Sequence, residues 1–140
     1  MHPVSVYRDA ERLYHCMGDL FTWAFAEPGL GDHLRASGLS IRLNMTDPES
    51  VVSLDLGHAV IETGPDSTIA ATVDLHLTAD TAHDFWLGRV NVPLAVAKGT
   101  IKSKGPMAKV LMLGPLIPPL SGKYEEILRD AGLEKSLIGS

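Results

Sequence analysis

The sequence has little cysteine, few aromatic residues and no apolar run long enough to cross a membrane. Cys16 is its one cysteine, so no disulfide can form within the chain. This excludes a secreted disulfide scaffold and leads us to expect a cytoplasmic location. The longest apolar run, residues 110–120, is interrupted by one glycine and three prolines, whereas a bilayer span needs about 20 residues. The first twenty residues lack a basic patch followed by an apolar run, so we expect no signal peptide.

Positive charge and nucleotide-binding motifs are also scarce. The chain has 12 basic and 17 acidic side chains and a net charge of −5, which argues against a nucleic-acid partner. The patterns GxGxxG, GxxxxGK[ST] and GxSxG do not occur, so nucleotide binding and hydrolase chemistry have no sequence signal. The six histidines show no metal-binding spacing. We therefore expect no cofactor and no metal.

The length and the 45% of apolar residues are typical of a globular protein, and we expect one domain spanning residues 1–140. Residues 7–27 place apolar side chains at the three-four spacing of an amphipathic helix. Ser5 is a plausible N-cap of this helix, and Pro28 and Gly29 end it.

The middle of the chain alternates between apolar and polar residues, which predicts half-buried strands over residues 40–47, 51–57 and 67–78. Residues 58–63 add a further short strand. The side chains expected to point inward are Ile41, Leu43, Met45, Val52, Leu54, Leu56, Ile69, Ala71, Val73, Leu75 and Leu77. Those expected to meet water on the other face are Arg42, Asn44, Asp55, Asp74 and His76.

The last part of the chain reads as helices around one more strand. Helices are predicted at residues 78–87, 107–113 and 124–131, with a short helical turn at 91–97. Residues 100–104 form the last strand, with Ile101 inward. The predicted fold class is α+β, with a five-stranded, mainly antiparallel sheet covered on one face by helices.

An ordered set of short motifs between residues 67 and 113 resembles the sterol carrier protein 2 (SCP2) family. The set comprises the strand VDLHLTAD, the step His83-Asp84-Phe85-Trp86, the segment Gly88-Arg89-Val90-Asn91 and the pattern GTIKxxG that ends at Gly105. The resemblance covers roughly residues 7–132. The chain departs from the family at Pro93, which we expect to interrupt a short helix, and in its proline-rich segment 114–120.

The resemblance implies an apolar tunnel between sheet and helices, and a ligand such as a sterol, fatty acid, acyl-CoA ester, phospholipid or quinone. The function it implies is non-covalent binding, transfer or presentation of that ligand. The residues expected to line the tunnel are Phe21, Phe25, Leu43, Leu54, Val73, Leu75, Phe85, Ile101, Val110, Leu113 and Ile117. Pro115, Pro118 and Pro119 would form a semi-rigid flap at its opening.

Two other functions stay open at this stage. An enzyme acting on a hydrophobic biosynthetic intermediate would need an inward-pointing His, Asp or Tyr, and the pattern offers Tyr14 and His15 nearby. An accessory protein that presents such an intermediate to an enzyme would show an exposed apolar patch near residues 116–120. The four lysines at positions 98, 102, 104 and 109 are interpreted as a solvated edge, with transient contact to anionic lipid headgroups as the alternative.

The remaining polar residues have structural interpretations. His83 and Asp84 are interpreted as helix cap and surface, because neighbouring side chains on a helix point in different directions. Cys16 and Trp86 are expected in the core. An acidic cluster of Asp55, Glu62 and Asp74 is an alternative to ordinary solvated carboxylates.

Overall fold

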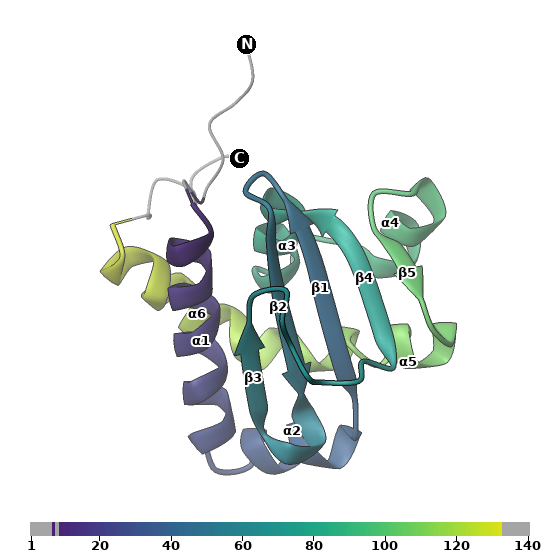
Figure 1. Ribbon diagram of the computed structural model, residues 1–140. Coiled ribbons are helices and arrows are strands. Elements are labelled where there is room, and N and C mark those ends of the chain that lie inside the picture. Colours follow the sequence, from purple (N-terminus) through teal and green to yellow (C-terminus); the bar gives the residue numbers. More distant parts are fainter. Residues whose placement is uncertain (1–6, 8, 133–140) are drawn as a thin grey trace.

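The computed structural model describes residue 7 and residues 9–132, which form one sheet with helices packed against it (Figure 1). In chain order the elements are α1 (Ala10–Ala26), α2 (Leu30–Ser37), β1 (Ser40–Thr46), β2 (Ser50–Asp55), the short 3-10 helix η1 (Leu56–His58), β3 (Val60–Thr63), β4 (Val73–Thr78), α3 (Ala79–Trp86), α4 (Val92–Lys98), β5 (Lys102–Lys104), α5 (Met107–Leu111), η2 (Gly114–Leu116) and α6 (Pro118–Asp130).

The sheet has the strand order β3-β2-β1-β4-β5 within the described part of the chain. Its central pair, β1 and β4, is parallel, and the other neighbouring pairs are antiparallel. The β2–β3 hairpin and the following loop return the chain to the start of β1, where the Thr72 amide donates to the Ser40 carbonyl at 3.0 Å. The predicted mainly antiparallel, five-stranded sheet is confirmed.

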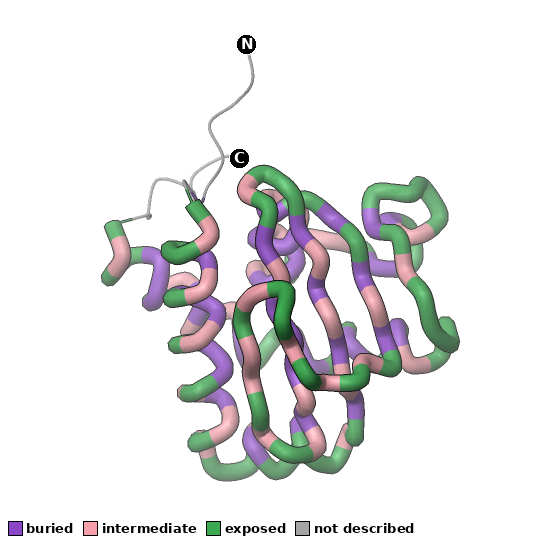
Figure 2. The backbone as a smooth tube through the Cα atoms, viewed as in Figure 1, coloured by how far each residue is buried: buried purple, intermediate pink, exposed green. Residues whose placement is uncertain are grey.

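The two faces of the sheet differ as the alternating pattern requires. Ile41, Leu43 and Met45 of β1 are buried, whereas Arg42 and Asn44 between them are half-buried. Figure 2 shows the same alternation of buried and less buried positions along β1 and β4. Helices α1 and α3 contact the sheet, and α6 contacts both of them. The apolar face is therefore covered by helices, and the polar face meets water.

Helix α1 begins later than expected and is followed by a helix that the sequence pattern did not reveal. The Asp9 side chain caps α1 by accepting from the Arg12 amide at 2.8 Å, and Ser5 lies outside the described residues. Helix α2 carries Leu34 into the core. A Cβ atom on Gly31 of this helix would lie 2.5 Å from the Phe25 carbonyl oxygen. Glycine at this position therefore allows α2 to approach the end of α1 closely.

The prediction that residues 67–72 belong to a strand was wrong. β4 begins at Val73, and Ile69 and Ala71 are half-buried rather than core residues. The segment before β4 is held by side chains instead of a ladder: Arg42 Nη2 donates to the Ile69 carbonyl at 2.9 Å. Side-chain bonds of this kind offer the backbone an alternative to strand pairing.

Three of the prolines lie in the first turns of helices and do not break them. This corrects the predicted helix interruption at Pro93 and the predicted start of the last helix at residue 124. Pro93 lies in the first turn of α4, which Asn91 caps by accepting from the Leu94 amide at 3.1 Å. Pro118 and Pro119 open α6, which starts six residues before the predicted position 124. Proline suits a first helical turn because those amides have no partner within the helix. The expected flap is therefore part of a helical segment.

Candidate functional site

An entirely apolar cavity lies between the sheet and the C-terminal helices. Its lining comprises Phe21, Leu34, Ile41, Leu54, Leu56, Trp86, Leu113, Leu116, Ile117 and Leu120. The cavity measures only about 10 Å³, barely the space that one water molecule needs. The tunnel that the family resemblance implied is thus not open in this structure.

Four of the predicted lining residues contact this cavity: Phe21, Leu54, Leu113 and Ile117. Others are buried in the surrounding core, namely Leu43, Val73, Leu75, Phe85, Ile101 and Val110. Phe25 is half-buried, with its ring 6.0 Å from that of Phe21. Sequence reasoning missed Leu34, Ile41, Leu56, Trp86, Leu116 and Leu120 as lining residues. Leu34 lies on α2, which the periodicity did not predict, whereas Leu56 was predicted to point inward but from a strand rather than from η1.

Trp86 is the lining residue that can form a hydrogen bond through its side chain. It is 4% exposed, and its Nε1–H has no acceptor within the described part of the chain. Edge-to-face contacts with Phe21 and Phe85, at centroid distances of 5.2 and 5.0 Å, hold the indole ring. An unsatisfied buried donor of this kind costs about 1–3 kcal/mol. Trp86 therefore borders the cavity and carries one buried donor that is not satisfied within the described part of the chain.

A buried hydrogen-bonded chain of side chains joins α3, α6 and the segment before α1. Tyr7 Oη and Tyr124 Oη are 2.5 Å apart, and Tyr124 Oη is 2.8 Å from His83 Nδ1. His83 is buried, so its interpretation as a surface residue was wrong. Burial raises the pKa of both tyrosines above the ordinary value and also raises the pKa of the Cys16 thiol. None of these four residues lines the apolar cavity.

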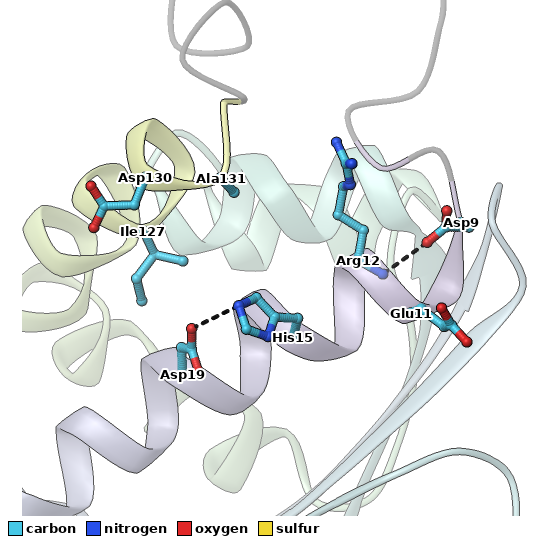
Figure 3. Close-up of a pocket in the computed structure, with 8 residues that line it drawn as sticks. All are labelled: Asp9, Glu11, Arg12, His15, Asp19, Ile127, Asp130 and Ala131. Carbon is cyan, nitrogen blue, oxygen red and sulfur yellow. Dashed lines mark hydrogen bonds and ion pairs between the residues drawn. The ribbon is translucent and has the colours of Figure 1, made fainter.

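A groove of about 460 Å³ lies between α1 and the end of α6 (Figure 3). Its lining is mostly charged: Asp9, Glu11, Arg12, His15, Asp19, Ile127, Asp130 and Ala131. His15, an expected candidate for an inward base, instead faces solvent and pairs with Asp19 at 3.2 Å. Four carboxylates make this groove unsuitable for a hydrocarbon.

A second groove, of about 760 Å³, lies at the end of the sheet where β1 and β4 finish. Its lining mixes Thr46, Thr78 and Lys102 with Met45 and Leu77. Tyr14, the other expected inward candidate, also lies here and accepts a hydrogen bond from the Val51 amide at 3.1 Å. Polar groups occur along the whole groove, so it does not resemble the dry interior of a lipid site.

The acidic cluster considered from the sequence does not form. Asp55 accepts from the His58 amide at 3.2 Å, and Glu62 accepts from the Thr68 amide at 3.0 Å. This backbone hydrogen bond is the main reason that the pKa of Glu62 is lowered. Asp55 faces Val60 across the sheet, and Asp74 lies two strands away on β4. Among the described residues no group of three or more His, Cys, Asp or Glu side chains could hold a metal ion.

Exposed apolar side chains occur, but not where an accessory protein was expected to show them. Leu116, Ile117 and Leu120 are buried against the core, which corrects the expected patch at residues 116–120. Exposed large apolar side chains are found instead at Val60, Leu94, Met107, Leu111 and Met112. Within the described ranges, no helix combines the length and apolar character that crossing a membrane requires.

Comparison with known proteins identifies the fold. No family model and no curated protein matches the chain. Among solved structures, sterol carrier protein 2 from Yarrowia lipolytica in its apo form superposes with a TM-score of 0.61 at 18% identity, over 72% of this chain and 86% of that chain. The sterol carrier protein domain 2 of Helicoverpa armigera gives a TM-score of 0.59 at 15% identity, over 79% and 89% of the two chains.

A third solved structure, the ubiquinone synthesis protein UbiJ-SCP2, gives a TM-score of 0.58 at 14% identity, over 75% of this chain and 87% of that chain. The strand order, the parallel central pair and the one-sided helical layer thus define an SCP2-like fold. These likenesses span most of this chain and of each compared chain.

Proposed function

We propose that this protein binds one neutral, largely apolar ligand between its sheet and its C-terminal helices, and transfers or presents it. The observation that carries the proposal is the apolar cavity lined in part by Trp86, a residue whose buried N–H is unsatisfied, in a fold shared with sterol carrier proteins. The eleven residues expected to line the tunnel remain the proposed ligand contacts, together with Trp86. We also propose that this site belongs to a single SCP2-like domain spanning residues 1–140 and acting in the cytoplasm.

Binding requires the cavity to expand, and residues 113–120, here called the gate segment, are the part best suited to move. Leu113, Leu116, Ile117 and Leu120 of this segment supply four of the ten lining residues. The η2 turn within it is held by single backbone bonds, such as Leu116 N to Leu113 O at 3.0 Å. Its three prolines have no amide hydrogen to donate. Outward displacement of the gate segment would therefore break few hydrogen bonds while opening the interior.

The chemistry of the lining selects among apolar ligands. No charged side chain contacts the cavity, and an ionised carboxylate buried without a partner is strongly disfavoured. The Trp86 N–H needs an acceptor, which a hydroxyl, ketone, ester or quinone oxygen provides. We therefore expect sterols, long-chain alcohols, esters and quinones to bind better than ionised fatty acids. The names of the sterol carrier and ubiquinone synthesis structures are consistent with such ligands.

Catalysis is not favoured by the cavity itself, because its lining has no titratable side chain. The buried residues His83, Tyr124 and Tyr7 form hydrogen bonds with one another and do not line the cavity. Burial of hydrocarbon supplies the driving force, since each CH₂ removed from water contributes about 0.8 kcal/mol. A weakly directional site of this kind favours broad specificity.

A pair of truncations tests the location of the site. Ile117→Ala enlarges the cavity, whereas Leu128→Ala removes a similar buried side chain that does not line it. Both should destabilise the protein by about 2–5 kcal/mol. Only Ile117→Ala should tighten ligand binding, because the ligand then fills space that is already open.

Affinity is measured by displacement of a fluorescent lipid analogue, and bound ligands are identified by native mass spectrometry of the purified protein. Equal changes in affinity for the two variants would show that the ligand does not occupy this cavity. Absence of binding by sterols, alcohols, esters and quinones alike would refute the proposed function.

A further inference from the structure

Positive charge is concentrated in one part of this acidic protein. Residues 85–124 contain six basic side chains and no acidic one. The other 100 residues contain six basic and 17 acidic side chains, a net charge of −11, whereas the whole chain has −5. A segregation this strong creates a local positive field on a molecule whose remaining surface is negative.

The structure gathers most of this charge along one edge of the sheet. Helix α4, the outermost strand β5 and helix α5 follow one another there, on the side of the sheet away from α1 (Figure 1). Lys98, Lys102 and Lys104 are exposed, and Lys109 is half-buried. Within the described residues none of these four lysines forms an ion pair. We call α4, β5 and α5 together the basic edge.

The same edge carries most of the exposed large apolar side chains. Leu94 on α4 is 48% exposed, Met107 and Leu111 on α5 are each 46% exposed, and Met112 directly after α5 is 43% exposed. Met107 and Leu111 are four residues apart and so share one face of α5. Elsewhere in the described chain, Val60 is the one comparable residue. Apolar and positively charged side chains thus occur together on the basic edge.

We propose that the basic edge docks on the surface of an anionic lipid bilayer. Leu and Met side chains can enter the boundary between headgroups and acyl chains, while lysines around them meet anionic headgroups. Five of the six basic residues in the segment are lysines, which act as hydrated point charges rather than as the planar forks that recognise specific partners. A single-stranded nucleic acid would instead be expected to meet exposed aromatic rings.

This inference does not depend on the ligand site, but it gives a reason for the position of the gate segment beside α5. The gate segment follows α5 directly in the chain. Docking through α5 therefore brings the gate segment close to the membrane, where an apolar ligand could enter or leave without crossing water.

The test compares binding of the full chain to two kinds of vesicle, one of phosphatidylcholine alone and one of phosphatidylcholine mixed with phosphatidylglycerol. We expect binding to the anionic vesicles only, weakening as salt is raised. Lys102→Gln/Lys104→Gln should bind them about 25-fold more weakly, since each lysine contributes about fivefold. Leu111→Ser should bind about tenfold more weakly through lost apolar contact.

A matched control removes the same charge from the other side of the molecule. Arg12→Gln/Arg129→Gln changes exposed residues of α1 and α6 and should leave vesicle binding nearly unchanged. An equal loss in this control, or no binding of the native chain to anionic vesicles, would overturn the proposal. Binding to soluble polyglutamate but not to vesicles would overturn it in favour of an acidic protein partner. Trp86→Phe should dock normally, which separates docking from ligand binding.

Discussion

Replacement of Trp86 by Phe is the most direct test of the proposed ligand site. The change removes the buried N–H that has no acceptor in the described chain and so recovers about 1–3 kcal/mol of desolvation cost. It also shrinks the ring, which enlarges the neighbouring cavity by roughly 40 Å³ and costs about 1 kcal/mol at ~24 cal/mol per Å³. The lost contacts of the smaller ring cost a similar amount. The free energy of unfolding should therefore change by no more than about 1 kcal/mol.

Ligand binding should respond to the same change in a selective way. The hydrogen bond to a ligand oxygen contributes about 1 kcal/mol, so a medium-chain alcohol should bind Trp86→Phe about fivefold more weakly than it binds the native protein. The alkane with the same number of carbons should bind both proteins equally, because it offers no acceptor. Chemical denaturation measures the free energy of unfolding, and displacement of a fluorescent lipid analogue measures the affinities for the alcohol and the alkane.

Trp23→Phe is the matched control, because Trp23 is half-buried on α1 and does not line the cavity. It should leave both affinities unchanged. If Trp86→Phe weakens alkane and alcohol equally, Trp86 acts through shape and not through its N–H. If the native protein already binds the two ligands with equal affinity, a polar anchor in the cavity is refuted.

Four further predictions concern the core and the first helix. Tyr124→Phe removes the hydroxyl that contacts both Tyr7 and His83, and should lower the free energy of unfolding by about 1–3 kcal/mol in denaturant titrations; an unchanged midpoint would contradict a role for this network. The raised pKa values of Tyr7 and Tyr124 mean that the folded protein keeps protons which the unfolded chain loses above about pH 10. The contribution of the two tyrosines to stability should accordingly be constant below that pH, and the free energy of unfolding should fall as pH rises beyond it, with a smaller fall in Tyr124→Phe. The Cys16 thiol is buried and its pKa is raised, so alkylation should be slow in the native protein and fast in denaturant, as followed by mass spectrometry. Asp9→Ala should cost about 1 kcal/mol, because Asp9 caps α1; no loss in thermal denaturation would show that the cap contributes nothing.

Local patterns in the sequence were sufficient to predict most of the elements. The alternation of Ile41, Leu43 and Met45 with polar residues predicted both the strand β1 and its buried face, because side chains of a strand point to opposite faces in turn. The apolar stripe of α1 predicted its core-facing side in the same way. Helix α2 was not predicted, because Leu34 is its one buried residue besides Gly31. A single apolar position does not make a periodic pattern. The start of α6 was missed because prolines were interpreted as breaks, although they are tolerated in a first turn.

The order of neighbouring residues was thus enough to predict the fold class, the two faces of the sheet and the apolar character of the interior. The burial of His83 could not be predicted in this way, because its partner Tyr124 lies 41 residues further along the chain and meets it only through folding. Tertiary contacts also determine which of many apolar side chains surround the cavity, and that one of them, Trp86, carries an unsatisfied donor. A hydrophobic side chain is apolar wherever it lies. Whether it packs against another side chain or borders a void depends on segments that meet only when the whole chain has folded.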